Sequence, residues 1–267
     1  MLQVMTSRAE RYARALSPRF RAKRKYQEEL GFWRQMAAQL HHWYVDGTLT
    51  DYWGVPQPST AQRMTRSSLW MSQAIETLHA MRPTYLEALQ VPSAHFAGRR
   101  VLEIGCGPLV PILAFSGCER HAVDPLVTNY IKAGFPLFDL PVTTVTAPAE
   151  HLPYPDGYFD AVISVNALDH VDDFELALAE FQRVLRPGGE VRLEIEYHRP
   201  TVTEPIEVTP ERLVKAFSRC ELTQVVERSG LDMFHSMVQR FHLRPRPETV
   251  SNFDHSTRFA TWQGRKR

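Results

Sequence analysis

One segment constrains the fold of this chain more than any other: residues Val101–Gly107, which read V-L-E-I-G-C-G. The apolar residues predict a buried strand, and the two glycines predict a tight turn directly after it, because glycine tolerates positive φ and carries no side chain. A helix that follows such a turn points its free N–H groups toward the same place. The segment is therefore typical of a strand–turn–helix unit in which backbone can approach a ligand, although an ordinary turn has the same pattern.

The residues after the glycine pair narrow the class of ligand. A dinucleotide-binding loop has glycine or alanine three positions after its second glycine, where this chain has Val110. A second apolar segment ends in Asp124, about 20 residues beyond the first glycine, from where a carboxylate can accept both hydroxyls of a ribose. The pattern disfavours a nicotinamide or flavin dinucleotide and favours another adenosine-containing cofactor.

Two further segments complete a recognisable series. Residues 149–165 read A-E-H-L-P-Y-P-D-G-Y-F-D-A-V-I-S-V, and residues 181–195 read F-Q-R-V-L-R-P-G-G-E-V-R-L-E-I. In this order the segments resemble the class I S-adenosylmethionine (SAM)-dependent methyltransferases that carry an E-x-G-x-G loop and an L-P-F-P-D-x-x-F-D segment. The resemblance covers roughly residues 99–228. It implies an α/β fold with a seven-stranded, mostly parallel Rossmann-like sheet, an antiparallel last strand, helices on both faces and an N-terminal helical lid.

The resemblance also implies which residues bind SAM. Glu103 and the glycine loop would lie along its methionine and ribose, Asp124 would hold the ribose hydroxyls, and Asn166 would lie near the reacting sulfonium. Pro148 offers no side-chain acceptor, so the adenine amino group needs Glu150, a backbone carbonyl or water. The implied cofactor-binding set is Glu103, Gly105, Cys106, Gly107, Asp124, Pro125, Ala149, Glu150 and Asn166.

Candidate proton acceptors follow the fourth and fifth predicted strands. Methyl transfer to a hydroxyl needs a group that takes its proton, and the candidates there are Asp169, His170 and His198. His170 stands in N-A-L-D-H-V, where a structural role at a helix start competes with proton transfer. We predict His170 and His198 as the catalytic residues.

The possible classes of methyl acceptor are narrowed mainly by motifs that the chain lacks. The segment after the fourth strand reads V-N-A-L-D-H and not the N-P-P-Y type that stacks a flipped adenine, and no cysteine stands where a cytosine-attacking nucleophile would. We therefore predict transfer to a small-molecule or sugar acceptor, at oxygen rather than at nitrogen or carbon. Two alternatives stay open: an RNA or protein methyltransferase that uses a basic N-terminus, and a SAM-binding protein without catalysis.

Hydrophobic periodicity divides the chain near residue 95. Residues 1–95 are expected to form an N-terminal helical lid or substrate region, and residues 96–267 the SAM-binding domain. Apolar residues at three- and four-residue steps predict a long amphipathic helix over residues 19–45 and a second helix from about residue 59. Aromatic residues at 43, 44, 52 and 53 suit an apolar wall over the substrate, although plain helix packing produces the same pattern.

Turn and cap residues place the remaining elements. A helix is predicted over residues 173–185, ended by Pro187-Gly188-Gly189, and a further helix is predicted with Thr209 as its cap and Pro210 at its first position. An insertion over residues 233–251 precedes the last strand. The expected strands cover residues 100–104, 120–123, 142–146, 159–165, 190–196, 222–228 and 258–263.

Composition limits the cofactors and partners. With 267 residues, 43% of them apolar, and a net charge of +1, the chain can bury a large core and favours no long-range electrostatic partner. The three cysteines lack C-x-x-C spacing and the 11 histidines form no ligand motif, so no metal is expected. No apolar run reaches the ~18 residues of a membrane span, and no secretory signal is evident. We expect a cytoplasmic protein with SAM as cofactor, a small-molecule substrate, and neither nucleic acid nor membrane as a partner.

Overall fold

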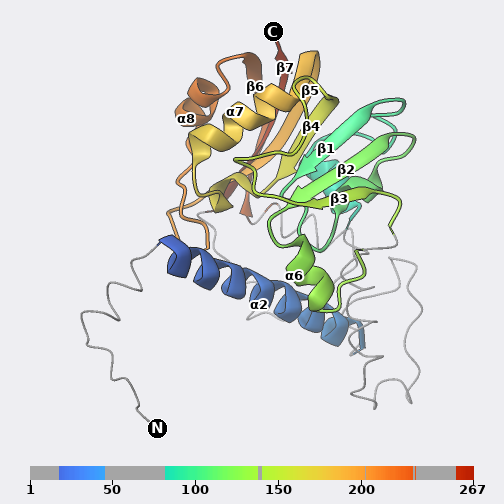
Figure 1. The fold of residues 1–267 in the computed structure, drawn as a ribbon, viewed down its shortest axis with the longest axis vertical. Coiled ribbons are helices and arrows are strands. Elements are labelled where there is room, and N and C mark those ends of the chain that lie inside the picture. Colours follow the sequence, from blue (N-terminus) through green and yellow to red (C-terminus); the bar gives the residue numbers. More distant parts are fainter. Residues whose placement is uncertain (1–17, 46–81, 138–139, 202, 231, 233–256) are drawn as a thin grey trace.

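A seven-stranded sheet with helices against both faces forms the centre of the molecule (Figure 1). The computed structural model describes residues 18–45, 82–137, 140–201, 203–230, 232 and 257–267, with side chains for residues 24–37 of the first range. The strands are β1 (Arg100–Ile104), β2 (Glu119–Asp124), β3 (Thr143–Thr146), β4 (Phe159–Val165), β5 (Leu185–Tyr197), β6 (Cys220–Ser229) and β7 (Arg258–Lys266). The helices are α2 (Pro18–Val45), α5 (Thr84–Ala88), α6 (Val127–Lys132), α7 (Phe174–Val184) and α8 (Pro210–Ala216), with short 3-10 turns η2 (Pro111–Ala114) and η3 (Leu168–His170).

The strand order fixes where a ligand can bind. The order in space is β3-β2-β1-β4-β5-β7-β6, in which β7 runs antiparallel between β5 and β6 and the other pairs are parallel. This confirms the predicted mostly parallel sheet with an antiparallel last strand. The order reverses between β1 and β4, and a crevice outside the carboxyl ends of the strands is the usual ligand site at such a switch point. Helix α2 runs along this edge of the sheet (Figure 1).

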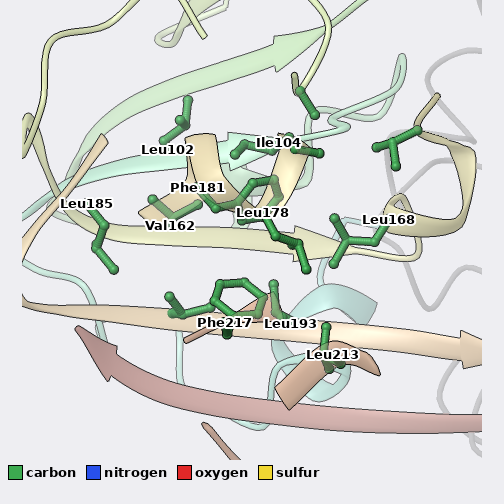
Figure 2. Packing of buried hydrophobic residues seen from close by; sticks show 14 of the residues in the cluster. Leu102, Ile104, Val162, Leu168, Leu178, Phe181, Leu185, Leu193, Leu213 and Phe217 are labelled. Carbon is green, nitrogen blue, oxygen red and sulfur yellow. The ribbon is translucent and has the colours of Figure 1, made fainter. Parts of the chain in front are cut away.

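Helix α7 shows how the sequence builds one layer of the core. The Asp173 carboxylate accepts a hydrogen bond from the backbone N–H of Leu176, 3.0 Å away, which caps the helix. Phe174, Leu178 and Phe181 then recur at three- and four-residue steps and are buried in one cluster with residues of β4 and β5. Figure 2 shows Leu178 and Phe181 beside Val162 of β4. The predicted helix over residues 173–185 is thereby confirmed to within a residue at either end.

A second apolar cluster covers the opposite face of the sheet. It contains Val101, Leu109 and Tyr130, and the apolar side of α2 packs against it through Tyr26, Leu30, Trp33 and Met36. The predicted long amphipathic helix over residues 19–45 is confirmed. The second predicted helix up to residue 81, the aromatic residues at 43, 44, 52 and 53, and the insertion over residues 233–251 lie outside the described residues or side chains.

One boundary differs from the prediction. Pro187, Gly188 and Gly189 do not separate α7 from the fifth strand, because β5 begins at Leu185, directly after the helix. Leu185 pairs with Phe159 and the next pair is Glu190 with Ala161, so the four residues 186–189, which include this triplet, bulge out between them. Gly188 has a φ of 72°, which suits glycine, so the triplet serves as a bulge within the strand.

The remaining cap follows the prediction. The Thr209 hydroxyl accepts a hydrogen bond from the backbone N–H of Arg212 at 3.2 Å, and Pro210 is the first residue of α8. Among the described residues, no helix is both long enough and apolar enough to cross a membrane.

Candidate functional site

A cavity of about 430 Å³ lies at the carboxyl ends of β1, β2 and β4, with α2 forming part of its wall. This volume is within the range of small-molecule sites, which is about 300–1,000 Å³. Two of the predicted site residues, Glu103 and His198, are not among its lining residues. The predicted residues that do line it are Gly105, Cys106, Gly107, Asp124, Pro125, Ala149, Glu150, Asn166 and His170.

The glycine loop has no room for side chains. Gly105 has a φ of 76°, and a Cβ atom built on it would lie 2.3 Å from the Cβ atom of Ala167. Gly107 has a φ of 52°, and its Cβ atom would lie 3.1 Å from the ring of Trp33 on α2. The backbone conformation favours glycine at both positions, the neighbour Ala167 excludes a Cβ atom at Gly105, and the loop lines the cavity.

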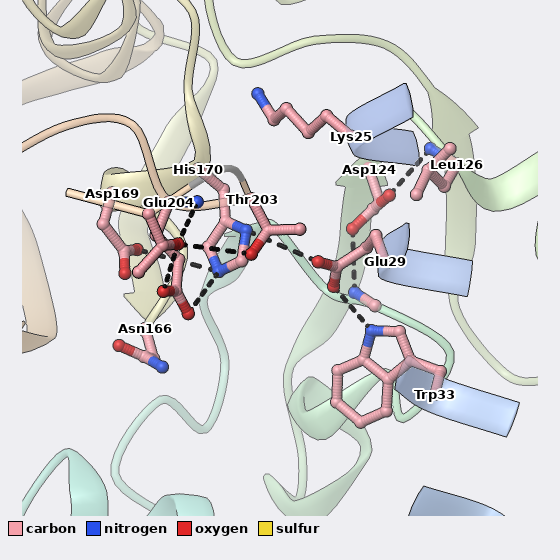
Figure 3. A network of polar contacts seen from close by, with 12 residues as sticks. Lys25, Glu29, Trp33, Asp124, Leu126, Asn166, Asp169, His170, Thr203 and Glu204 are labelled. Atoms are coloured by element: carbon pink, nitrogen blue, oxygen red, sulfur yellow. Dashed lines mark hydrogen bonds and ion pairs between the residues drawn. The ribbon is translucent and has the colours of Figure 1, made fainter. Parts of the chain in front are cut away.

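Asp124 is held at the end of β2 by backbone groups. Its two carboxylate oxygens accept hydrogen bonds from the N–H of Gly107 at 3.0 Å and from the N–H of Leu126 at 2.7 Å (Figure 3). Burial raises the pKa of Asp124 to about 6, against the lowering effect of these two hydrogen bonds. The carboxylate is thus pre-oriented, and each oxygen keeps a further lone pair for a ligand hydroxyl.

Glu103 is a buried residue of β1 that stabilises the segment after the glycine loop. Its Oε2 atom accepts a hydrogen bond from the N–H of Ile112 at 3.0 Å, and only 2% of the residue is exposed. Burial raises the pKa of Glu103 to about 8, although the Ile112 hydrogen bond and the nearby Arg82 lower it. This placement ties the segment after the loop to β1.

Glu150 lines the cavity but is bonded to backbone. Its Oε1 atom accepts hydrogen bonds from the N–H groups of Asp172 at 2.7 Å and Asp173 at 3.0 Å, so it joins the segment after β3 to the start of α7. The side chain of Asp172 in turn pairs with Lys25 of α2 at 2.9 Å. The segment that carries Ala149 is thereby fixed relative to both helices.

Asn166 follows β4 in a conformation that is rare for residues other than glycine, with a φ of 46°. Its Nδ2 atom donates to Glu196 at 3.1 Å, whereas its buried Oδ1 atom has no hydrogen-bond partner. An unsatisfied buried acceptor in a cavity wall indicates a place where a ligand donor can bind.

The two predicted histidines have different surroundings. His198 donates from Nε2 to Asp169 at 2.9 Å and from Nδ1 to the carbonyl oxygen of Arg199 at 2.7 Å. The hydrogen bond to Asp169 raises the pKa of His198 to about 9 against the opposing effect of burial, so the ring is charged at neutral pH. His170 lines the cavity, with its Nδ1 atom 3.5 Å from Glu29 and its Nε2 atom 3.9 Å from Glu204.

Helix α2 contributes polar groups that the sequence did not single out. Trp33 donates from Nε1 to Glu29 at 2.8 Å, and both residues line the cavity together with Lys25 (Figure 3). Glu204, from the segment before α8, lines the cavity as well. The spacing of residues 25, 29 and 33 along one helix face was the available signal for the first three.

Comparisons with known proteins agree with this geometry. The model of the family described as "Methyltransferase domain" matches residues 102–193. The chain is 36% identical to the ubiquinone/menaquinone biosynthesis C-methyltransferase UbiE of Hahella chejuensis over 40% of this chain and 42% of that protein. It is 24% identical to the methyltransferase GfsG of Streptomyces halstedii over 86% of this chain and 82% of that protein. The chain thus spans less than half of the first relative and most of the second.

The fold also matches a solved structure. A SAM-dependent methyltransferase from Mesorhizobium loti superimposes with a TM-score of 0.50 and 17% sequence identity, covering 68% of this chain and 96% of that chain. The predicted seven-stranded, mostly parallel Rossmann-like sheet is thereby confirmed.

Proposed function

Because the chain carries a class I SAM-dependent methyltransferase domain, we propose that it transfers a methyl group from SAM to an oxygen atom of a small, largely apolar acceptor. The observation that supports this proposal is the lining of the cavity. Apolar side chains such as Phe32, Met36 and Phe259 share its wall with the polar side chains of His170 and Glu204. An apolar molecule with a hydroxyl group is complementary to both parts of such a lining.

The residues present fit SAM as the cofactor. The glycine loop admits no side chain, Asp124 offers an oriented carboxylate, and Asn166 has an acceptor without a partner. When bound, SAM supplies a methyl group activated by its sulfonium. We assign Asp124 to the ribose hydroxyls, the loop to the methionine and ribose, and Asn166 to the neighbourhood of the sulfonium.

Ala149 and Glu150 complete the cofactor assignment on the adenine side. The side chain of Glu150 already accepts two backbone hydrogen bonds, so its contribution to adenine recognition is to fix the backbone of this segment. Glu103 supports the loop from beneath and does not line the cavity.

On the acceptor side we assign the contact with the hydroxyl to His170. It lines the cavity, whereas both ring nitrogens of His198 are engaged by Asp169 and by the carbonyl oxygen of Arg199. His198 therefore acts as a positioning residue that holds Asp169. The apolar side chains of α2 exclude water from the reacting groups, which prevents it from competing with the acceptor.

Two measurements test this function in sequence. Calorimetric titration with SAM and with S-adenosylhomocysteine measures cofactor binding without any acceptor. Turnover on a panel of hydroxylated apolar metabolites with methyl-labelled SAM then identifies the product, and its NMR spectrum distinguishes a methyl group on oxygen from one on carbon or nitrogen.

The outcomes separate the alternatives. A methoxy product supports the proposal, and a C-methyl or N-methyl product overturns the assignment of oxygen. Tight SAM binding with no turnover on any acceptor class indicates a SAM-binding protein without catalysis. Turnover only on RNA or protein, with binding that weakens steeply as salt increases, indicates a macromolecular substrate.

A further inference from the structure

Three ligand-type side chains converge beside the cavity (Figure 3). Asp169 and His170 come from η3, and Glu204 comes from the segment before α8. The His170 Nε2 atom lies 3.9 Å from Asp169 Oδ1 and 3.9 Å from Glu204 Oε1, and the three atoms lie within 4.8 Å of one another. His170 and Glu204 line the cavity, so the cluster is accessible from it.

These distances are too long for hydrogen bonds but suit ligands of one ion. Direct nitrogen–oxygen hydrogen bonds are about 2.7–3.2 Å long. Divalent cations hold oxygen and nitrogen ligands at about 2.0–2.2 Å, so neighbouring ligand atoms lie about 3 Å apart and opposite ones about 4.2 Å apart. The two separations from His170 Nε2 fall between those two values, and all three ligand atoms lie within 4.8 Å of one another.

In both Asp169 and Glu204, the carboxylate oxygen that faces away from His170 Nε2 already has a hydrogen-bond partner. Asp169 Oδ2 accepts from His198 at 2.9 Å, and Glu204 Oε2 accepts from the Thr201 hydroxyl at 2.8 Å. The His170 Nδ1 atom faces Glu29 Oε2 at 3.5 Å. A carboxylate on the far nitrogen of a histidine and a donor on the far oxygen of a carboxylate are the arrangement that orients metal ligands. The three atoms that face one another, Asp169 Oδ1, His170 Nε2 and Glu204 Oε1, are thus directed at a common point.

The charges around this point call for a cation. Three carboxylates, those of Glu29, Asp169 and Glu204, lie within 3.9 Å of a ring nitrogen of His170. The side chain of Asp169 is only 4% exposed, and its Oδ2 atom pairs with His198, so Oδ1 is the oxygen that faces the site. A divalent cation matches both the ligand atoms and the charge.

We propose that Asp169, His170 and Glu204 bind a divalent first-row metal ion such as Mn²⁺ at the wall of the cavity. One imidazole and two carboxylates suit this class of metal, and three protein ligands leave coordination positions open toward the cavity. The hydroxyl oxygen of the acceptor occupies one of them, so that the contact between His170 and the acceptor runs through the metal ion. The binding of the acceptor hydroxyl to the metal ion rests on the proposed oxygen methylation, whereas the binding of the metal ion to the protein does not.

No metal was expected because the cysteines and histidines form no ligand motif, and Glu204 is remote in sequence from the Asp169-His170 pair. The fold brings Glu204 close to Asp169 and His170. The backbone N–H of Ile206 donates to the carbonyl oxygen of Asp169 at 3.2 Å, which holds the segment with Glu204 against η3.

The test uses the full chain, freed of any polyhistidine tag and treated with a chelator. Titration with Mn²⁺ alone is followed by the electron paramagnetic resonance signal of the free ion, and SAM affinity is measured on the same samples. We expect one Mn²⁺ per chain and an affinity at least about 10-fold weaker in Glu204→Gln and in His170→Gln. Glu207→Gln, which makes the same charge change at an exposed position of the same segment, should bind Mn²⁺ as the wild type does.

Two results overturn the metal site: no saturable Mn²⁺ binding by the wild type, or equal affinities in Glu204→Gln and Glu207→Gln. Circular dichroism shows whether each variant is folded, and two ligand variants keep the test valid if one misfolds. Retained SAM binding without Mn²⁺ binding overturns the metal site alone. Mn²⁺ binding with a product methylated at carbon or nitrogen overturns the oxygen assignment alone and leaves the metal site in place.

Discussion

The contact between the glycine loop and Ala167 can be tested by adding a single methyl group. In Gly105→Ala the new Cβ atom would lie 2.3 Å from the Cβ atom of Ala167, where ordinary contacts begin at 3.4 Å, so the two segments must separate by about 1 Å. Overpacking of this kind costs about 1–3 kcal/mol. A non-glycine residue at a φ of 76° costs a further 1–2 kcal/mol or so. We expect the free energy of unfolding to fall by about 2–5 kcal/mol.

Two companion variants separate the two costs. Gly98 has a φ of 74° with nothing within 4 Å of its Cβ position, so Gly98→Ala measures the backbone cost alone. Gly105→Ala combined with Ala167→Gly removes the clash while keeping the backbone cost, apart from a flexibility penalty of about 0.5–1 kcal/mol for the new glycine. Chemical denaturation of the four proteins gives the free energies of unfolding. The reasoning is refuted if Gly105→Ala costs no more than Gly98→Ala, or if Ala167→Gly fails to recover any of the loss.

Further predictions concern charge. Asp124→Asn should weaken SAM binding by about 1.5–3 kcal/mol, the contribution of hydrogen bonds to a charged group, as measured by titration calorimetry. Because burial raises the pKa of Asp124 to about 6, wild-type SAM affinity should also decline as the pH falls through 6, and the Asn variant should lack this decline. Glu190 accepts from Arg192, His95 and Arg99 at 2.7–2.8 Å, and although burial raises its pKa, these partners lower it to about 2. Glu190→Gln should therefore cost about 2–3 kcal/mol in urea denaturation at pH 7, a loss that shrinks as the pH falls from about 4.5 toward 2, whereas exposed Glu221→Gln should change stability little at either pH.

The strands were predictable because their signals are local. Strands β1 and β4 are mainly apolar runs that are followed by Gly105 and Asn166, and burial on both faces of a parallel sheet produces such runs. The boundary at Pro187-Gly188-Gly189 was wrong for a reason that is not local. Proline and glycine favour a break in the chain, but the pairing of Leu185 with Phe159 extends β5 back to the helix. Tertiary pairing therefore overrode the turn signal.

The sequence also predicts that the residues proposed to bind SAM lie together, since they stand at the ends of strands and the strand order brings these ends together. The surroundings of His170 could not be predicted in this way. His170 acquires its neighbours Glu29 and Glu204 from segments far away in the sequence, and nothing in either segment specifies that contact. Periodicity identified the apolar face of α2 but left open which edge of the sheet that face covers.

The charged residues of α2 explain how its position is settled. Lys25 and Glu29 are four residues apart and so lie on one side of the helix, next to the apolar face. Lys25 pairs with Asp172 at 2.9 Å, and Glu29 faces His170, two positions before Asp172, at 3.5 Å. Sliding the helix by one turn would bring the Glu29 carboxylate next to that of Asp172 and remove it from His170. Apolar packing alone tolerates such a slide, because the apolar residues recur every turn, so the charge pattern selects the register in which Trp33 covers the glycine loop.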